Sequence, residues 1–220
     1  MLNDLLIRLH RSIEAQVPRK VVRDLRNHLR FGSGAPLSDE QIWIDPALVD
    51  HAYVRDPVAG VWRRRHSGQV TAGDWDRSLR PLRDMVKHRA CVDHFERGLT
   101  WEETGIYDEM MRRIAHGKVI DGCRSLADVR ARYATIDALY DTIRRDGAFT
   151  PMAHHPERLR REHGGIFVHL SRDGTPILGG NGNHRLAIAQ ILKLPKVPAQ
   201  VGVVHADLVR AGGFASLRKA

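Results

Sequence analysis

The chain of 220 residues carries 35 lysines and arginines against 26 aspartates and glutamates, a formal net charge of +9 that favours anionic partners such as nucleotides, nucleic acid or acidic lipid. This length and an ordinary apolar content predict one elaborated domain rather than two full ones. Two cysteines, Cys91 and Cys123, and the lack of a secretory signal or a long apolar run argue against a disulfide scaffold and a membrane span, so we expect a reducing, cytoplasmic setting.

Residues 1–40 are expected to form a basic, amphipathic helical extension that ends in a linker. Apolar residues recur at helical spacing before and after Pro18, namely Leu2, Leu5, Leu6, Leu9 and Ile13, then Val22, Leu25 and Leu29. Arginines and lysines accompany both stripes, so residues 1–31 are candidates for contact with an anionic membrane surface. The simpler interpretation, which we favour, is that the apolar stripe packs on the domain and the cations face solvent.

Residues 41–118 are predicted to combine short strands with a helical hairpin. Gln41–Ile44 favours a strand that ends at Asp45 and Pro46, and residues 68–76 resemble a strand, a turn and an acidic tip. From Pro81 the apolar spacing becomes helical, and a capping box formed by Thr100 and Glu103 is expected to open a second helix. We treat this hairpin as an insertion at about 81–118 in a domain that spans residues 41–220.

The rest of the chain is predicted to hold the clearest helix and three further strands. Ser125 and Asp128 have capping-box spacing, and apolar residues follow along one helical face until Gly147. The remaining elements are expected in this order: strand 165–171, turn 172–174, strand 175–178, a glycine-rich turn, helix 183–194 and strand 198–205.

The glycine-rich turn at residues 179–185, Gly-Gly-Asn-Gly-Asn-His-Arg, is the strongest candidate for a binding site. It leads into a helix that is apolar almost all round, and the fixed start of such a buried helix presents unpaired N–H groups and the positive end of the helix dipole to an anion. Gly179, Gly180 and Gly182 would let the backbone approach a ligand, while His184 and Arg185 add donors. The alternative is an ordinary turn with a solvated Arg185, because the spacing is neither a Walker loop nor a dinucleotide fingerprint.

The succession of strand, Gly-x-His-Arg, helix, proline and strand through Gly180 to Val203 resembles the ParB/sulfiredoxin superfamily. Ile42–Pro46 is similar to its opening strand and Arg132–Gly147 to its middle helix, so the likeness covers roughly the last 95 residues well and residues 41–76 loosely. It implies an α+β fold with a small mixed sheet, and it places Gly182, His184 and Arg185 on the phosphate-contacting box. The residues we therefore expect at the phosphates are Gly180, Asn181, Gly182, Asn183, His184 and Arg185.

Members of that superfamily include CTP-switched partition proteins, ATP-using sulfiredoxin and small-molecule kinases. No helix-turn-helix domain follows the signature here, so sequence-specific DNA is not an expected partner, and Asn183 stands where sulfiredoxin-like chemistry would want a cysteine. The kinase-like members resemble this chain more. They imply a nucleotide-dependent phosphotransferase that acts on a small molecule or glycan with ATP, ADP or CTP and with Mg²⁺ as an optional ion. The competing interpretation is a non-catalytic, nucleotide-gated or DNA-associated protein that uses Arg63–Arg65 on phosphate backbones.

A phosphotransferase also needs a carboxylate near the phosphates, and Asp74 and Asp76 are our first candidates, with His184 as a further catalytic residue. In an extended stretch, side chains at 74 and 76 point the same way and could meet one Mg²⁺ ion or one substrate hydroxyl. The alternative is an Asx-type turn that caps the helix near Pro81. We assign no metal-binding residues, because the 13 histidines lack zinc-site spacing.

Overall fold

The computed structural model describes residues 17–58, 60–154 and 165–219. In these parts the chain forms a mixed α+β fold around a seven-stranded open sheet with the strand order β1-β7-β5-β6-β2-β4, and β3 pairs with β7 outside this path. The strands are β1 (Gln41–Ile44), β2 (His51–Tyr53), β3 (Val70–Thr71), β4 (Leu79–Pro81), β5 (Ile166–Leu170), β6 (Pro176–Leu178) and β7 (Val197–His205). The sheet is mixed, because β7 runs parallel to β5 but antiparallel to β1.

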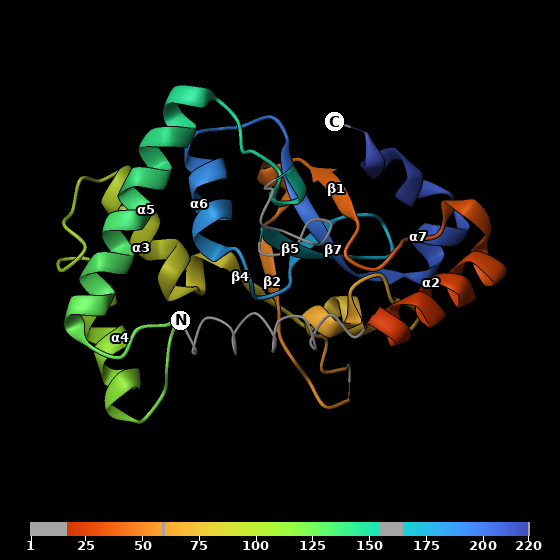
Figure 1. The fold of residues 1–220 in the computed structure, drawn as a ribbon, viewed down its shortest axis with the longest axis horizontal. Coiled ribbons are helices and arrows are strands. Elements are labelled where there is room, and N and C mark those ends of the chain that lie inside the picture. The colour runs from red at the N-terminus through yellow and green to blue at the C-terminus, as the bar shows by residue number, and fades with distance from the viewer. Residues whose placement is uncertain (1–16, 59, 155–164, 220) are drawn as a thin grey trace.

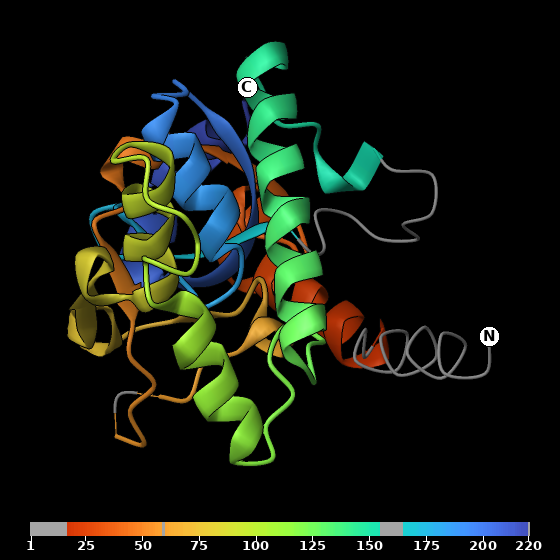
Figure 2. The ribbon, with the colours of Figure 1, turned by 90° about the vertical axis from the view of Figure 1, so that its left-hand side faces the viewer.

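Helices lie on both sides of the strands. They are α2 (Val17–Phe31), α3 (Val86–Phe95), α4 (Ile106–Ala115), α5 (Leu126–Asp146), α6 (Asn183–Ile191) and α7 (Ala206–Arg210). In Figure 1, α3, α4, α5 and α6 lie to the left of the strands and α2 and α7 to the right. Figure 2 looks onto the helical layer from the left, with α5 running along it. Among the described residues, no helix is long and apolar enough to cross a membrane.

The core sits between the central strands and α6. Every residue of β5 and β7 is buried, as expected for strands that are covered on both faces. In α6, Leu186, Ala187 and Ile188 are fully buried, which confirms that a helix apolar almost all round lies inside the fold. This burial holds the start of α6 in one place, and that start is the end of the glycine-rich turn.

Several predicted elements are confirmed. The strand Gln41–Ile44 forms with the expected bounds. The Ser125 side chain accepts a hydrogen bond from the backbone N–H of Asp128 at the start of α5, and Gly147 ends that helix with a φ of 67°. These signals were local, because a cap residue and a terminating glycine act within one turn of the helix.

Two predictions need correction. The Thr100–Glu103 box does form, with the Glu103 carboxylate 2.7 Å from the Thr100 amide, but it closes a separate turn, and α4 begins only at Ile106, after left-handed Gly105. The expectation that α2 packs its apolar stripe on the domain is wrong, because Val22, Leu25 and Leu29 are exposed. The first predicted helix, before residue 17, lies outside the described residues.

The predicted insertion at about 81–118 is closely integrated into the fold. Its first helix, α3, packs directly against α6, and its second helix, α4, contacts α5. The ring of Trp101 in the connection packs at a tilt against Tyr133 of α5, with 4.7 Å between the ring centroids. The insertion therefore forms one wall beside the glycine-rich turn.

Candidate functional site

The glycine-rich turn is held against β5 by backbone contacts. The Gly179 amide donates to the Phe167 carbonyl at 2.7 Å, and the Phe167 amide donates to the Asn181 carbonyl at 3.3 Å. Gly182 has a φ of +83°, and a Cβ at this position would lie 2.6 Å from the Ile166 Cα. Only glycine therefore fits at this position, because the turn approaches β5 closely. This structural requirement exists whether or not a ligand binds.

The N-terminus of α6 opens without a cap. Gly182 is the N-cap residue, no side chain among the described residues caps this helix end, and the first turn of the helix contains no acidic residue. Intrahelical bonding starts with the Leu186 amide, which donates to the Gly182 carbonyl at 2.9 Å. The first N–H groups of α6 thus lie ahead of the intrahelical hydrogen bonds, and they carry the positive end of the dipole of a buried helix. This is the backbone arrangement that binds phosphate in many proteins.

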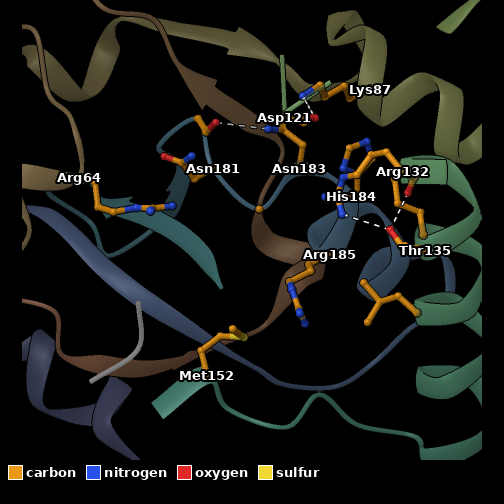
Figure 3. A pocket seen from close by; sticks show the side chains of 15 residues that line it. Arg64, Lys87, Asp121, Arg132, Thr135, Met152, Asn181, Asn183, His184 and Arg185 are labelled. Carbon is orange, nitrogen blue, oxygen red and sulfur yellow. Dashed lines mark hydrogen bonds and ion pairs between the residues drawn. The ribbon is translucent and has the colours of Figure 1, made fainter. Parts of the chain in front are cut away.

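The turn lines a cavity of about 620 Å³, which falls within the usual range for small-ligand sites. Apart from residues 180–185, its walls come from segments that are far apart in the sequence. The polar side chains among them are Arg64, Lys87, Asp121, Arg132 and Thr135. Figure 3 shows Arg64 on one side of the turn and Arg132 on the other, with the start of α6 between them.

Positive charge dominates this cavity. Four cationic side chains line it, from Arg64, Lys87, Arg132 and Arg185, whereas Asp121 is the one carboxylate among the described residues that do so. The Arg185 guanidinium lies 5.5 Å from the centre of the Phe149 ring, a cation–π contact that orients it. Such a set of cations around an open helix N-terminus is suited to a ligand with several negative charges.

Asp121 enters the cavity on a tight turn between α4 and α5. The Cys123 amide donates to the Ile120 carbonyl at 2.9 Å, and Asp121 and Gly122 between them have φ values of 53° and 86°. Two left-handed residues in succession are typical of a type I′ turn, for which Asp-Gly is a favoured pair. The Asp121 Oδ2 lies 2.5 Å from the Lys87 Nζ. Burial raises the pKa of Asp121, but the charge and hydrogen bond of Lys87 outweigh it, so the pKa is lowered overall.

His184 is placed in the cavity wall as a neutral side chain. It is only 7% exposed, and its Nε2 lies 3.4 Å from the hydroxyl of Tyr133. Burial, reinforced by the nearby positive charge of Lys87, lowers the pKa of His184 to about 3. At neutral pH the imidazole therefore offers a neutral donor or acceptor to a ligand instead of a positive charge.

Asn183 presents an unused acceptor beside the same site. Its Nδ2 lies 3.4 Å from the Gly180 carbonyl, and its Oδ1 is buried without a hydrogen-bond partner. Buried polar atoms in native proteins are nearly always paired, so this oxygen is suited to accept a hydrogen bond from a ligand or a water molecule. Asn183, Gly180 and Lys87 also line a second, adjoining cavity of about 240 Å³ on the side of α3 and α4.

Asp74 and Asp76, the expected catalytic carboxylates, lie elsewhere. Arg172 binds both: its guanidinium is 2.6 Å from Asp76 Oδ1, 2.8 Å from Asp76 Oδ2 and 2.7 Å from Asp74 Oδ1. Arg172 belongs to the turn before β6, whereas the glycine-rich turn follows β6, and the three residues of that strand span about 10 Å. Both carboxylates therefore anchor the β5–β6 hairpin at the end opposite the cavity.

The pKa shifts fit this structural role. The hydrogen bond from Arg172 lowers the pKa of Asp74. Burial raises the pKa of Asp76, but its several hydrogen bonds with Arg172 lower it more. A carboxylate whose proton affinity is reduced by a bound guanidinium is a poor proton acceptor. The Asx-type cap offered as the alternative is not formed either. The N-cap residues of the helical turn Leu82–Asp84 and of α3 are Pro81 and Met85, and no described side chain caps either start.

Four charged residues of the cavity were not predicted from the sequence as members of this site. Arg64 was noted only as part of a basic run, and Lys87 and Arg132 lie on helices with no local sign that they face the glycine-rich turn. The Asp121-Gly122 pair does carry a turn signal, but that signal says nothing about what the aspartate faces. Comparison of the chain with protein-family models, curated proteins and solved structures finds no match.

Proposed function

We propose that the chain binds a nucleoside phosphate in the cavity at the start of α6 and transfers its terminal phosphoryl group to an acceptor. The observation that carries the proposal is the N-terminus of a buried helix in a cavity that, among the described residues, is lined by four cationic side chains and one carboxylate. The N–H groups of residues 183–185 bind phosphate oxygens, and Arg132 and Arg185 grip them as forks.

The fold is compatible with a ParB/sulfiredoxin-like core, which we propose on the basis of connectivity. Strand β6, the glycine-rich turn, α6 and β7 follow one another in the order that the resemblance implies, and α5 precedes them. The central strands β5 and β7 are parallel, and α6 lies in the connection from the β5–β6 hairpin to β7. A nucleotide-using member of this kind would act in the cytoplasm, where nucleoside triphosphates are abundant.

Asp121 replaces Asp74 and Asp76 as the carboxylate for the chemistry. In the transfer, the acceptor hydroxyl oxygen forms a bond to the terminal phosphorus while the bond from that phosphorus to the bridging oxygen breaks. Lys87 first exchanges Asp121 for a phosphate oxygen, so that its charge no longer lowers the proton affinity of this carboxylate. The hydroxyl proton then passes to Asp121, and the nucleotide shortened by one phosphate leaves. If Mg²⁺ takes part, Asp121 and Asn183 supply oxygen donors, since this ion is commonly held by one or two carboxylates and by substrate phosphates.

The adjoining cavity of about 240 Å³ is the proposed binding site for the acceptor. It shares Lys87, Gly180 and Asn183 with the larger cavity, so an acceptor in it would meet the phosphate chain at these residues. Holding both reactants in one geometry is the main contribution that a protein makes to phosphoryl transfer.

A non-catalytic, nucleotide-gated binding protein is the second candidate. The observation in its favour is the ion pair of Asp121 with Lys87, which leaves the carboxylate already engaged. Turnover separates the two functions: ATP, ADP and CTP are incubated with the full chain, with and without Mg²⁺, and with a mixed panel of hydroxylated acceptors. Phosphoryl transfer supports the enzyme, binding without turnover supports the gated protein, and no binding of any nucleotide contradicts both.

A further inference from the structure

Helix α2 is attached to the domain by its polar face. Lys20 Nζ lies 2.5 Å from Asp39 Oδ2, and both side chains are buried. The Arg23 guanidinium donates to the Ser67 carbonyl at 2.6 Å, and Asn27 Nδ2 donates to the Gly68 carbonyl at 2.7 Å. Three polar side chains at positions 20, 23 and 27 thus fix one side of the helix to the loops beneath it.

The apolar side of α2 faces away from the domain. Its residues follow at spacings of one, three and four, with exposed fractions of 59% for Val21, 67% for Val22, 59% for Leu25 and 78% for Leu29. A helix on the surface of a domain normally turns such a stripe inward. In Figure 1, α2 lies at the outer edge of the fold, on the opposite side of the sheet from α3–α6.

The exposed side of α2 is also basic. Arg19, Arg26 and Arg30 are exposed beside the apolar stripe. The one acidic residue of the helix, Asp24, is half-buried and accepts hydrogen bonds from the amide and hydroxyl of Ser38 at 2.8 Å. A partner for this face therefore needs an apolar layer that can take valine and leucine side chains, bordered by negative charge.

We propose that α2 docks in the plane of an anionic membrane surface. In this geometry the stripe of Val21, Val22, Leu25 and Leu29 enters the boundary between headgroups and acyl chains, and the flanking arginines bind lipid phosphates. An anionic lipid bilayer offers both the apolar layer and the negative charge that this face of α2 requires. A second copy of this chain also carries a net charge of +9 and would bring like charges together. The inference does not depend on the proposed phosphotransfer.

Vesicle flotation of the full chain tests this inference. The vesicles contain phosphatidylcholine alone or with about one third phosphatidylserine, a content that gives a strongly negative surface. The wild type is expected to bind only the anionic vesicles, and to be released as NaCl rises from about 0.1 M to about 0.5 M, because salt screens the attraction.

Two pairs of variants with matched controls locate the contact. Leu25→Ser with Leu29→Ser should lower the partition coefficient at least about tenfold, since each loses several buried methylene equivalents. The exposed Val58 and Val119, changed together to serine, are the control and should have no effect. Arg26→Gln with Arg30→Gln should also weaken binding, whereas the same change at the exposed Arg144 and Arg145 of α5 should weaken it much less.

Three results would overturn the proposal. One is that the wild type does not float with anionic vesicles. Another is binding that survives both α2 variants, which would place the contact elsewhere on the chain. The third comes from analytical ultracentrifugation: a dimer that Leu25→Ser with Leu29→Ser converts to a monomer would show that a second copy covers the stripe. Circular dichroism of each variant shows that its fold is retained, as expected for changes at exposed positions.

Discussion

Lys87 on α3 and Asp121 on the turn before α5 form an ion pair inside the cavity, with 2.5 Å between Nζ and Oδ2. The pair joins the helical insertion to the turn and brings both charges beside the start of α6. It keeps Asp121 ionised, and it places an ammonium group where it can exchange the carboxylate for a phosphate oxygen. In the proposed function Lys87 serves binding and Asp121 serves the chemistry, and the two roles can be measured separately.

Changing Asp121 to asparagine should abolish turnover while nucleotide binding persists. The variant removes the negative charge next to the phosphate path and frees Lys87, so the affinity for ATP should stay equal or rise. Loss of a proton acceptor or metal ligand should lower the turnover rate about 100-fold or more. Calorimetric titration with ATP and a steady-state assay give the two values. Full turnover in the variant would exclude a catalytic role for Asp121.

Arg132→Gln should weaken nucleotide binding about 10-fold to 100-fold, the effect of losing a charge-assisted hydrogen bond worth about 1.5–3 kcal/mol. Arg130→Gln is the matched control, because Arg130 lies on the same helix but pairs with Glu102 on the surface. The dissociation constant of ATP is measured for both. Equal effects of the two changes would mean that only the overall charge of the protein matters.

Gly182→Ala should destabilise the fold more than Gly147→Ala. Both glycines have left-handed backbones, but a Cβ at 147 meets open space, whereas a Cβ at 182 meets the backbone of Ile166. We expect a loss of about 1 kcal/mol in the free energy of unfolding for the control and at least about 2 kcal/mol for Gly182→Ala. Urea denaturation measures both. Similar losses would show that the turn relaxes away from β5.

Acid should weaken the fold through its buried histidines. Burial, aided by the charges of His66 and Arg55, lowers the pKa of His169 to about 3 from an ordinary value of 6.5. Below pH 6.5 the unfolded chain binds a proton that the folded chain does not, so the free energy of unfolding falls as the pH drops from about 6.5 towards 3. The slope is at most about 1.4 kcal/mol per pH unit for one such histidine.

His169→Asn isolates this contribution. The Val203 amide donates to His169 Nδ1 at 2.9 Å, and the asparagine oxygen can accept the same hydrogen bond without titrating. The stability of the variant, measured by urea denaturation between pH 7 and pH 4, should depend less on pH than that of the wild type. An unchanged slope would mean that His169 becomes protonated in the folded chain.

The parts of the structure that could be predicted depend on local interactions. The caps of α5, the strand at 41–44 and the buried helix after the glycine-rich turn follow from residues within a few positions of each other. The cavity depends on packing between distant segments. Lys87 comes from α3, which packs against α6, Asp121 and Arg132 come from α5 and the turn before it, and Arg64 comes from the helical turn Arg64–His66 beside β7. The wrong assignment of Asp74 and Asp76 has the same cause, because their partner Arg172 lies almost a hundred residues away in the sequence.

Phosphate binding at the start of α6 can be observed most directly by titrating ¹⁵N-labelled protein with inorganic pyrophosphate and following the backbone amide signals. We expect saturable chemical-shift changes at Gly182, Asn183, His184 and Arg185, the amides at the open helix end, and much smaller changes at the N-terminus of α5, which Ser125 caps. The same titration of Arg132→Gln should saturate at higher pyrophosphate. If the amides of 182–185 do not shift, or if the shifts centre on another surface, phosphate does not bind at this turn.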